Sequence, residues 1–212
     1  MTDPTYPIWV EEDPMKFRQL TGTHAGRIVL TAVPVAVVAT VLMTGVAYGA
    51  VPVSFSVSGS QFQISASSLV GTGFSQYAGV APDTAGTPHQ VAIANIKSAT
   101  LADLCQSVVT NTPLGKVGML ITAGGGGNPA TATDLQIGMT DLKGDSSFRN
   151  IRIGVDASTV NTAAKGSAGD FAQDADSITI KALQQTAWST QASVFTLNGM
   201  HVQVTDGSKG CF

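Results

Sequence analysis

Residues 51–66 read VPVSFSVSGSQFQISA, and this stretch decides the fold class of the chain. Apolar and polar side chains alternate strictly along residues 51–58, Gly59 and Ser60 interrupt the pattern, and the alternation resumes through residue 66. Alternation of this kind is typical of a half-buried strand, and the Gly-Ser pair predicts a turn between two strands. The chain is therefore expected to form an all-β domain from about residue 50 onward.

The sequence downstream continues with short alternating segments. Only residues 99–109 show helical spacing, and they are predicted to form either one helix or a bent strand. We expect an antiparallel sandwich or a rolled sheet. A weak echo between residues 62–71 (FQISASSLVG) and 135–144 (LQIGMTDLKG) keeps a β-solenoid as the alternative. The further predicted strands, each bounded by Gly, Asn, Asp, Ser or Pro, are 90–96, 116–122, 134–140, 148–155, 177–183, 193–198 and 200–205.

Composition narrows the class of protein. The 212 residues suffice for one folded body, and only 12% of them are charged, with a formal net charge of -3. Lys and Arg form no cluster that would neutralise a phosphate backbone, so nucleic acid is not an expected partner. All ten acidic residues after residue 50 are Asp, the carboxylate that suits turns.

An uncharged apolar segment precedes the strands. Residues 28–48 contain 21 apolar or small residues, and a helix of that length spans about 30 Å of hydrocarbon. Lys16, Arg18 and Arg27 lie before it, so the positive-inside rule places the N-terminus in the cytoplasm. A cleavable signal peptide is the alternative, although the apolar run exceeds the usual signal core.

The expected organisation has three parts: a cytoplasmic segment at 1–26, one transmembrane helix at 27–49 and an extracytoplasmic β domain at 50–212. The helix is also predicted to pack against another helix, because small residues four apart let two backbones approach closely. The alternative is that Ala and Val merely suit a signal-like segment. The predicted packing residues are Ala32, Ala36, Ala39 and Thr40.

The chain has two cysteines, Cys105 and Cys211, both on the predicted outer side of the membrane. In that oxidising setting one disulfide is the expected state, and two buried free thiols are the alternative. A metal pair is not expected, since no second pair of His or Cys stands at ligand spacing.

The sequence lacks a recognisable catalytic constellation. It contains no Gly-x-Ser-x-Gly, and the Gly-Asp-Ser at 144–146 is not followed by the Asp-x-x-His that would supply a base. His89 and His201 are read as a loop residue and a solvent-facing strand residue. The aspartates of the loop GDFAQDAD, residues 169–176, do not match the spacing of a calcium loop. No catalytic, cofactor-binding or metal-binding residue is therefore predicted.

Several longer segments carry a family resemblance. They include VSFSVSGSQFQISASSLVGTGFSQY at 53–77, IKSATLADLCQSVV at 96–109, QTAWSTQASVFTLNGMHVQV at 185–204 and the terminal KGCF. With these segments the sequence resembles an actinobacterial family of secreted or membrane-anchored proteins of unknown function, some of which are automatically named cholesterol esterase. The resemblance implies a cell-envelope protein, often encoded beside a multi-pass membrane protein, and it brings no accepted activity or catalytic residues.

These observations favour a non-enzymatic, membrane-anchored envelope protein that serves as a structural or accessory subunit of a membrane or surface assembly. Its expected partners are membrane lipid and either further copies of the chain or a multi-pass membrane protein. A lipid- or sterol-binding module at the membrane surface is the alternative, and an ester hydrolase is less favoured. A sizeable apolar cavity inside the sheet would favour the lipid-binding module, whereas a filled interior would favour the structural role.

Overall fold

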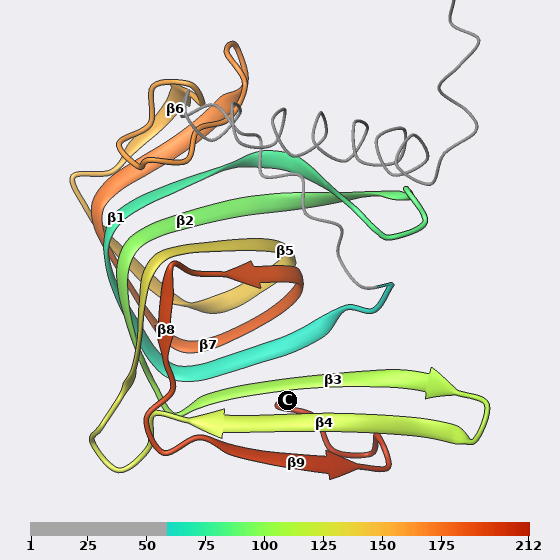
Figure 1. Ribbon diagram of the computed structural model, residues 1–212. Coiled ribbons are helices and arrows are strands. Elements are labelled where there is room, and N and C mark those ends of the chain that lie inside the picture. Colours follow the sequence, from blue (N-terminus) through green and yellow to red (C-terminus); the bar gives the residue numbers. More distant parts are fainter. Residues whose placement is uncertain (1–58) are drawn as a thin grey trace, which may run out of the picture. The chain divides into compact units, whose positions relative to one another are not determined.

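The computed structural model describes residues 59–212, which form a single antiparallel β-sheet of nine strands (Figure 1). The all-β antiparallel prediction is thus confirmed for this part of the chain. The strands are β1 (Phe62–Pro82), β2 (Pro88–Ala102), β3 (Leu104–Thr112), β4 (Gly115–Ala123), β5 (Ala130–Arg149), β6 (Arg152–Asp156), β7 (Phe171–Gln191), β8 (Val194–Thr196) and β9 (His201–Thr205).

Several predictions fall outside the described residues and stay predictions. Within residues 59–212 no helix has the length and apolarity needed to span a bilayer. The predictions concerned are the cytoplasmic segment 1–26, the transmembrane helix 27–49, its packing residues Ala32, Ala36, Ala39 and Thr40, and the strand 51–58.

Four long strands close the sheet on itself. β1 pairs with β2, β2 with β5, β5 with β7, and β7 returns to β1. The closing ladder is long, running from the pair Phe62 and Ala187 to the pair Tyr77 and Ala172. The result is a rolled antiparallel sheet, one of the two forms that the alternation left open.

The interior of this ring is the hydrophobic core. Leu69, Leu135 and Leu183 are among its largest fully buried side chains. Alanines such as Ala99, Ala132 and Ala175 alternate with larger residues around the ring, and short side chains of this kind let facing strands approach. The ring interior is therefore closely packed, which accounts for the low charge and the high content of small apolar residues in the sequence.

The strands β1, β2, β5 and β7 are longer than predicted, because their alternation is interrupted. β8 and β9 are slightly shorter than predicted, and the predicted strand 148–155 is wrong: β5 ends at Arg149, Asn150 has a positive φ of 52°, and β6 begins at Arg152. In β1, Gly73 has a positive φ of 65°, and the inward direction shifts there from odd to even residues. A Cβ at Gly71 would lie 2.6 Å from the side chain of Ile96, so Gly71 points inward, and so does the buried Phe74. Reading strict alternation alone ends the strand too early at such a position.

The segment 99–109 is a bent strand and not a helix. β2 ends at Ala102 and β3 begins at Leu104, with Asp103 between them at a φ of 50°. Both strands pair with β1 in one continuous register, and the Ser67 hydroxyl donates to the Asp103 carboxylate at 2.6 Å. The helical spacing of the apolar residues here comes from this bend.

The two echoing segments lie on opposite sides of β7. Residues 62–71 belong to β1, where Gln63 pairs with Thr186, and residues 135–144 belong to β5, where Gln136 pairs with Gln191. The echo therefore reports two strands that flank a common neighbour in an antiparallel sheet.

A smaller three-stranded part extends the sheet beyond the ring. β3 joins β1 through residues 105–108, β4 pairs with β3, and β9 pairs with β4. Figure 1 shows β3, β4 and β9 side by side, with the C-terminus beside them. The strand order ends at β9, which makes it an edge strand.

Candidate functional site

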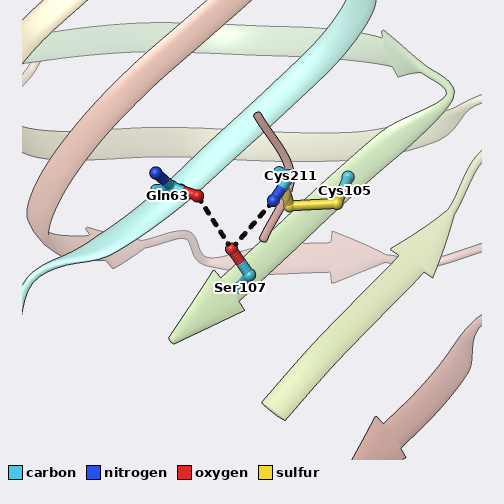
Figure 2. Close-up of a disulfide and its surroundings, with 4 residues drawn as sticks. All are labelled: Gln63, Cys105, Ser107 and Cys211. Carbon is cyan, nitrogen blue, oxygen red and sulfur yellow. Dashed lines mark hydrogen bonds between the residues drawn. A yellow bond between two sulfur atoms is a disulfide. The ribbon is translucent and has the colours of Figure 1, made fainter. Parts of the chain in front are cut away.

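The C-terminal tail is fastened to β3 by a disulfide, as Figure 2 shows. Cys105 and Cys211 are bonded, which confirms the predicted pairing. The Ser107 hydroxyl accepts a hydrogen bond from the N–H of Cys211 at 3.1 Å and donates one to Gln63 Oε1 at 3.3 Å. The tail is thereby tied both to β3 and to the first strand of the ring.

The tail covers one face of the three-stranded part. A Cβ at Gly118 of β4 would lie 2.9 Å from the Cα of Gly207 and would also meet the hydroxyl of Thr205. Only glycine permits this close approach. Since side chains alternate along a strand, the residues of β3 and β4 next in sequence to the covered ones point to the opposite face.

That opposite face is apolar and exposed, and we refer to it as the apolar face. Neighbouring strands align Val108 with Met119 and Met119 with Val204, and they also align Ile121 with Val202. The exposed fractions are 78% for Val204, 45% for Val202, 42% for Val117 and 40% for Met119. The apolar face consists of Val108, Val117, Met119, Ile121, Val202 and Val204.

The apolar face carries no formal charge. β3, β4 and β9 contain a single Lys or Arg, Lys116, and no Asp or Glu. Lys116 alternates onto the tail side, where its Cβ would contact a side chain built at Gly207. Water therefore meets aliphatic side chains on β4 and β9, beside the half-buried Val108 of β3, without the charged residues that usually protect an exposed sheet.

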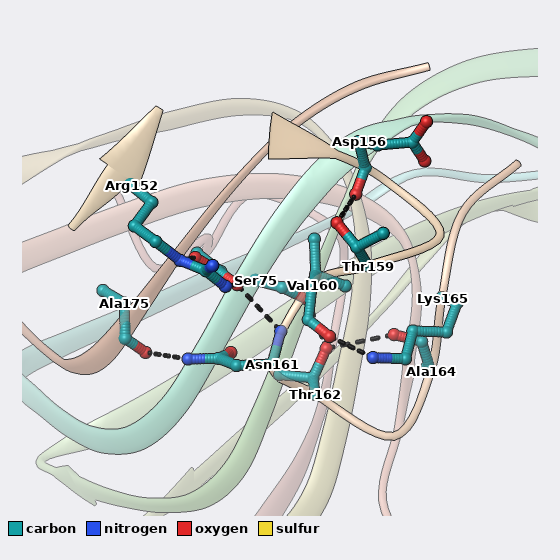
Figure 3. A network of polar contacts seen from close by, with 11 residues as sticks. Ser75, Arg152, Asp156, Thr159, Val160, Asn161, Thr162, Ala164, Lys165 and Ala175 are labelled. Carbon is teal, nitrogen blue, oxygen red and sulfur yellow. Dashed lines mark hydrogen bonds and ion pairs between the residues drawn. The ribbon is translucent and has the colours of Figure 1, made fainter. Parts of the chain in front are cut away.

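A polar network occupies the other end of the domain, between β7 and the loop that follows β6 (Figure 3). Asp174, whose side chain is 1% exposed, accepts from Arg152 Nε at 2.8 Å and Nη2 at 2.5 Å, and from the N–H of Asn161 at 2.8 Å. The Arg152 guanidinium, and after it the Asn161 N–H, hold the pKa of Asp174 below its ordinary value against the opposing effect of burial. The Asn161 side chain in turn donates to the carbonyl of Ala175.

A row of polar side chains continues from this network around the ring. The Ser75 hydroxyl shares a hydrogen bond with Thr162 at 2.5 Å and accepts one from Asn95 at 3.2 Å. Gln136 donates to Asn95 at 2.8 Å and accepts from Gln191 at 2.6 Å. These side chains are hydrogen-bonded to one another across β1, β2, β5 and β7. The row therefore links the four strands, and few of its donors and acceptors are available to a ligand.

His89 has an acidic partner, and none of the described residues places a nucleophile beside it. Its Nε2 lies 3.3 Å from Asp83 Oδ2, and its ring stacks on Trp188 with a centroid distance of 3.7 Å. The backbone N–H of Thr87 holds the pKa of Asp83 below its ordinary value. Among residues 59–212 no serine hydroxyl or cysteine thiol is hydrogen-bonded to His89, so the pair does not form a Ser-His-Asp arrangement there. His89 is the second residue of β2, which begins at Pro88, so it is not a loop residue, whereas His201 is exposed on β9 as predicted.

The remaining polar candidates are dispersed. Asp174 is engaged by Arg152, and Asp176 accepts from the Asn150 amide at 2.7 Å. In the part of the chain that the structure describes, no three His, Cys, Asp or Glu side chains converge as metal ligands. Ser146, from the Gly-Asp-Ser sequence, lies in β5 and pairs with Ile180.

Inside the ring, the described residues line a small cavity. It measures about 50 Å³ and is lined by residues including Phe74, Met139 and Gln185. Pockets that hold drug-sized ligands are typically about 300–1,000 Å³. Two larger hollows lie open at the surface, one of about 410 Å³ beside Lys209 and one of about 650 Å³ beside Val80.

A model described as a family of unknown function (DUF6230) matches residues 58–212, about three quarters of the chain. The chain belongs to this family. Its match confirms the resemblance to a family of unknown function, and DUF6230 carries no activity that could be assigned to these residues. No curated protein and no solved structure matches the chain.

The apolar face of this DUF6230 domain was not identified from the sequence. Residues 116–122 and 200–205 were both predicted as strands, and the alternation of Val202 and Val204 with His201 and Gln203 was visible. That alternation indicates which residues share a face. It does not indicate which of the two faces the C-terminal tail covers.

Proposed function

We propose that the protein is a non-enzymatic, membrane-anchored cell-envelope protein that acts as a structural or accessory subunit of a membrane or surface assembly. In this proposal residues 27–49 form one transmembrane helix, residues 1–26 are cytoplasmic and the β domain is extracytoplasmic. The observation that carries the proposal is the apolar face on β3, β4 and β9.

The size of this face fits a protein contact. The four exposed fractions quoted above correspond to roughly 300 Å² of apolar surface, and full cover would contribute on the order of 7 kcal/mol at about 25 cal/mol per Å². The entropic cost of association offsets a large part of this gain. Patches of about this size are often functional in monomeric proteins, and this one extends to β9, which among residues 59–212 pairs only with β4.

The small cavity supports the structural role over a lipid- or sterol-binding module. The cavity that the described residues line inside the ring measures about 50 Å³, several times less than a typical ligand pocket, so this cavity would not admit an apolar ligand of sterol size. The predicted partners are therefore membrane lipid around the helix and either further copies of the chain or a multi-pass membrane protein.

The test is native mass spectrometry of the full chain extracted from membranes in gentle detergent. We expect a mass above that of one chain, and we expect Met119→Glu to reduce it, because a buried carboxylate would oppose contact through the apolar face. The matched control is Val80→Glu, at a 58% exposed position that pairs with Gln90 of β2, whereas β3 joins β1 only at residues 62–65. A single-chain mass for the unaltered protein, or an unchanged assembly in Met119→Glu, would contradict the proposal.

A further inference from the structure

In the described part of the sheet, β9 is the edge strand next to β4. It pairs with β4 along one side, from Gly118 and Thr205 to Thr122 and His201, and within residues 59–212 no strand pairs with its other side. Natural proteins usually protect such edges with Lys, Pro, a bulge or a covering loop. The sequence of β9, His-Val-Gln-Val-Thr, contains neither Lys nor Pro, and its pairing with β4 runs without a register shift.

The apolar face extends to this edge. Val204 is more exposed than Val202, Val117 or Met119, and it lies on the outermost strand. A further strand beside β9 would cover Val202 and Val204 and would extend the apolar face across the new pair. The occupant of the edge should therefore be an extended segment with apolar side chains at matching positions.

We propose that this occupant is β9 of a second copy of the chain, paired antiparallel about a twofold axis at Gln203. The proposal rests on the proposed function and names one partner within the assembly. Because Gln203 is the middle residue of the strand His201–Thr205, this register pairs all five residues of both copies. It sets Val202 opposite Val204 of the second copy, so the exposed valines of each copy contact those of the other.

The polar groups also suit an antiparallel pair. Gln203 would face Gln203 of the second copy, and two amides can both donate and accept a hydrogen bond. His201 lies at one end of β9 and Asp206 directly follows the other end. The Ser208 hydroxyl holds the pKa of Asp206 below its ordinary value, so its carboxylate is an anion at neutral pH. Antiparallel pairing brings the imidazole end of one strand beside the carboxylate end of the other, whereas parallel pairing would set like ends together.

The area of this contact determines whether pairing is expected between free domains or only in a shared membrane. A pair of five-residue strands buries much less than the roughly 1,200 Å² of a stable protein interface, so the contact should be weak between free domains. A shared membrane would raise the effective concentration of the two edges and would favour their pairing. The experiment therefore uses the full chain in membranes.

The test is a symmetric cross-link. With the twofold axis at Gln203, the two Cα atoms would lie about 4.5–5.5 Å apart, within the range that a disulfide bridges. Under mild oxidation in native membranes, Gln203→Cys should give a reducible dimer in most of the chain, and peptide mapping should show the Cys105 to Cys211 bond unchanged. Gln90→Cys, at an exposed position of β2, is the matched control and should stay at least tenfold less cross-linked.

A second variant tests the edge itself. Adding Val204→Lys to Gln203→Cys should lower the cross-linked fraction at least tenfold, because a lysine on an edge strand disfavours pairing. Val80→Lys in the same background should leave it unchanged. An assembly of more than one chain that gives no cross-link at Gln203 would overturn the β9 pairing and leave the proposed function standing. A single-chain mass in gentle detergent, together with no cross-link in membranes, would overturn both.

Discussion

Removing the disulfide between Cys105 and Cys211 should lower the free energy of unfolding by up to about 5 kcal/mol. The bond joins residues 106 apart in the sequence, and the chain-entropy relation gives about 4.8 kcal/mol for a loop of that length. The full value of about 4.8 kcal/mol applies if the disulfide restricts only the conformations of the unfolded chain. The double substitution of both cysteines by alanine is the appropriate change, since it leaves no lone thiol.

The assay is urea unfolding of the full chain in detergent, followed by far-UV circular dichroism with and without the disulfide. We expect a lower midpoint and a larger m-value, because the unbridged unfolded chain is more expanded. Hydrogen exchange should show that residues 206–212 lose protection first. Of the contacts between the tail and β3 shown in Figure 2, the variant keeps only the hydrogen bond from the backbone N–H of residue 211 to the Ser107 hydroxyl.

A matched variant separates the bond from the tail contact. Ser107→Ala keeps the disulfide and removes the hydroxyl that contacts Cys211 and Gln63, so it should cost only about 1–2 kcal/mol. If the double alanine variant loses less than about 1 kcal/mol, the loop-closure reasoning is wrong for this domain. If residues 206–212 keep their protection in that variant, the tail is held by contacts other than the disulfide.

Three further predictions concern other parts of the chain. Arg152→Met should raise the pKa of Asp174, because the guanidinium is the main cause of its low value. The stability that the ionised carboxylate contributes is complete above about pH 3.9 and is lost as the pH falls through the pKa of Asp174 in the folded state. Acid unfolding of the variant should therefore begin at a higher pH than acid unfolding of the unaltered protein. Gly118→Ala should displace the tail, because its Cβ would lie 2.9 Å from a tail backbone atom, and we expect faster hydrogen exchange at residues 206–212 with the disulfide intact. Ala36→Leu with Thr40→Leu should preserve membrane insertion and reduce the native mass in gentle detergent, because close helix approach is lost, and an unchanged mass would make the helix an anchor only.

The sequence alone predicted the β class, and it favoured an antiparallel sheet over a β-solenoid and a disulfide over two buried free thiols. Strict alternation around residues 61–66 is a local property, and a half-buried strand needs no knowledge of its partner to be recognised. Two cysteines on the same predicted side of a membrane likewise allow a single disulfide within the chain. Whether residues 99–109 form a helix or a bent strand was left open. Asp103 has a positive φ and shifts the alternation, so the apolar residues on either side of it show a helical spacing.

Only the tertiary structure decided that the sheet closes and which of its faces is exposed. Closure depends on the ladder between β1 and β7, whose paired residues are 95 to 125 positions apart, and no local pattern encodes that distance. The apolar face follows from the same kind of long-range contact: the disulfide brings the tail to one side of β3 and β4, and Val202 and Val204 are left on the other side. Alternation assigns residues to two faces, but the burial of a face depends on segments that arrive from elsewhere in the chain.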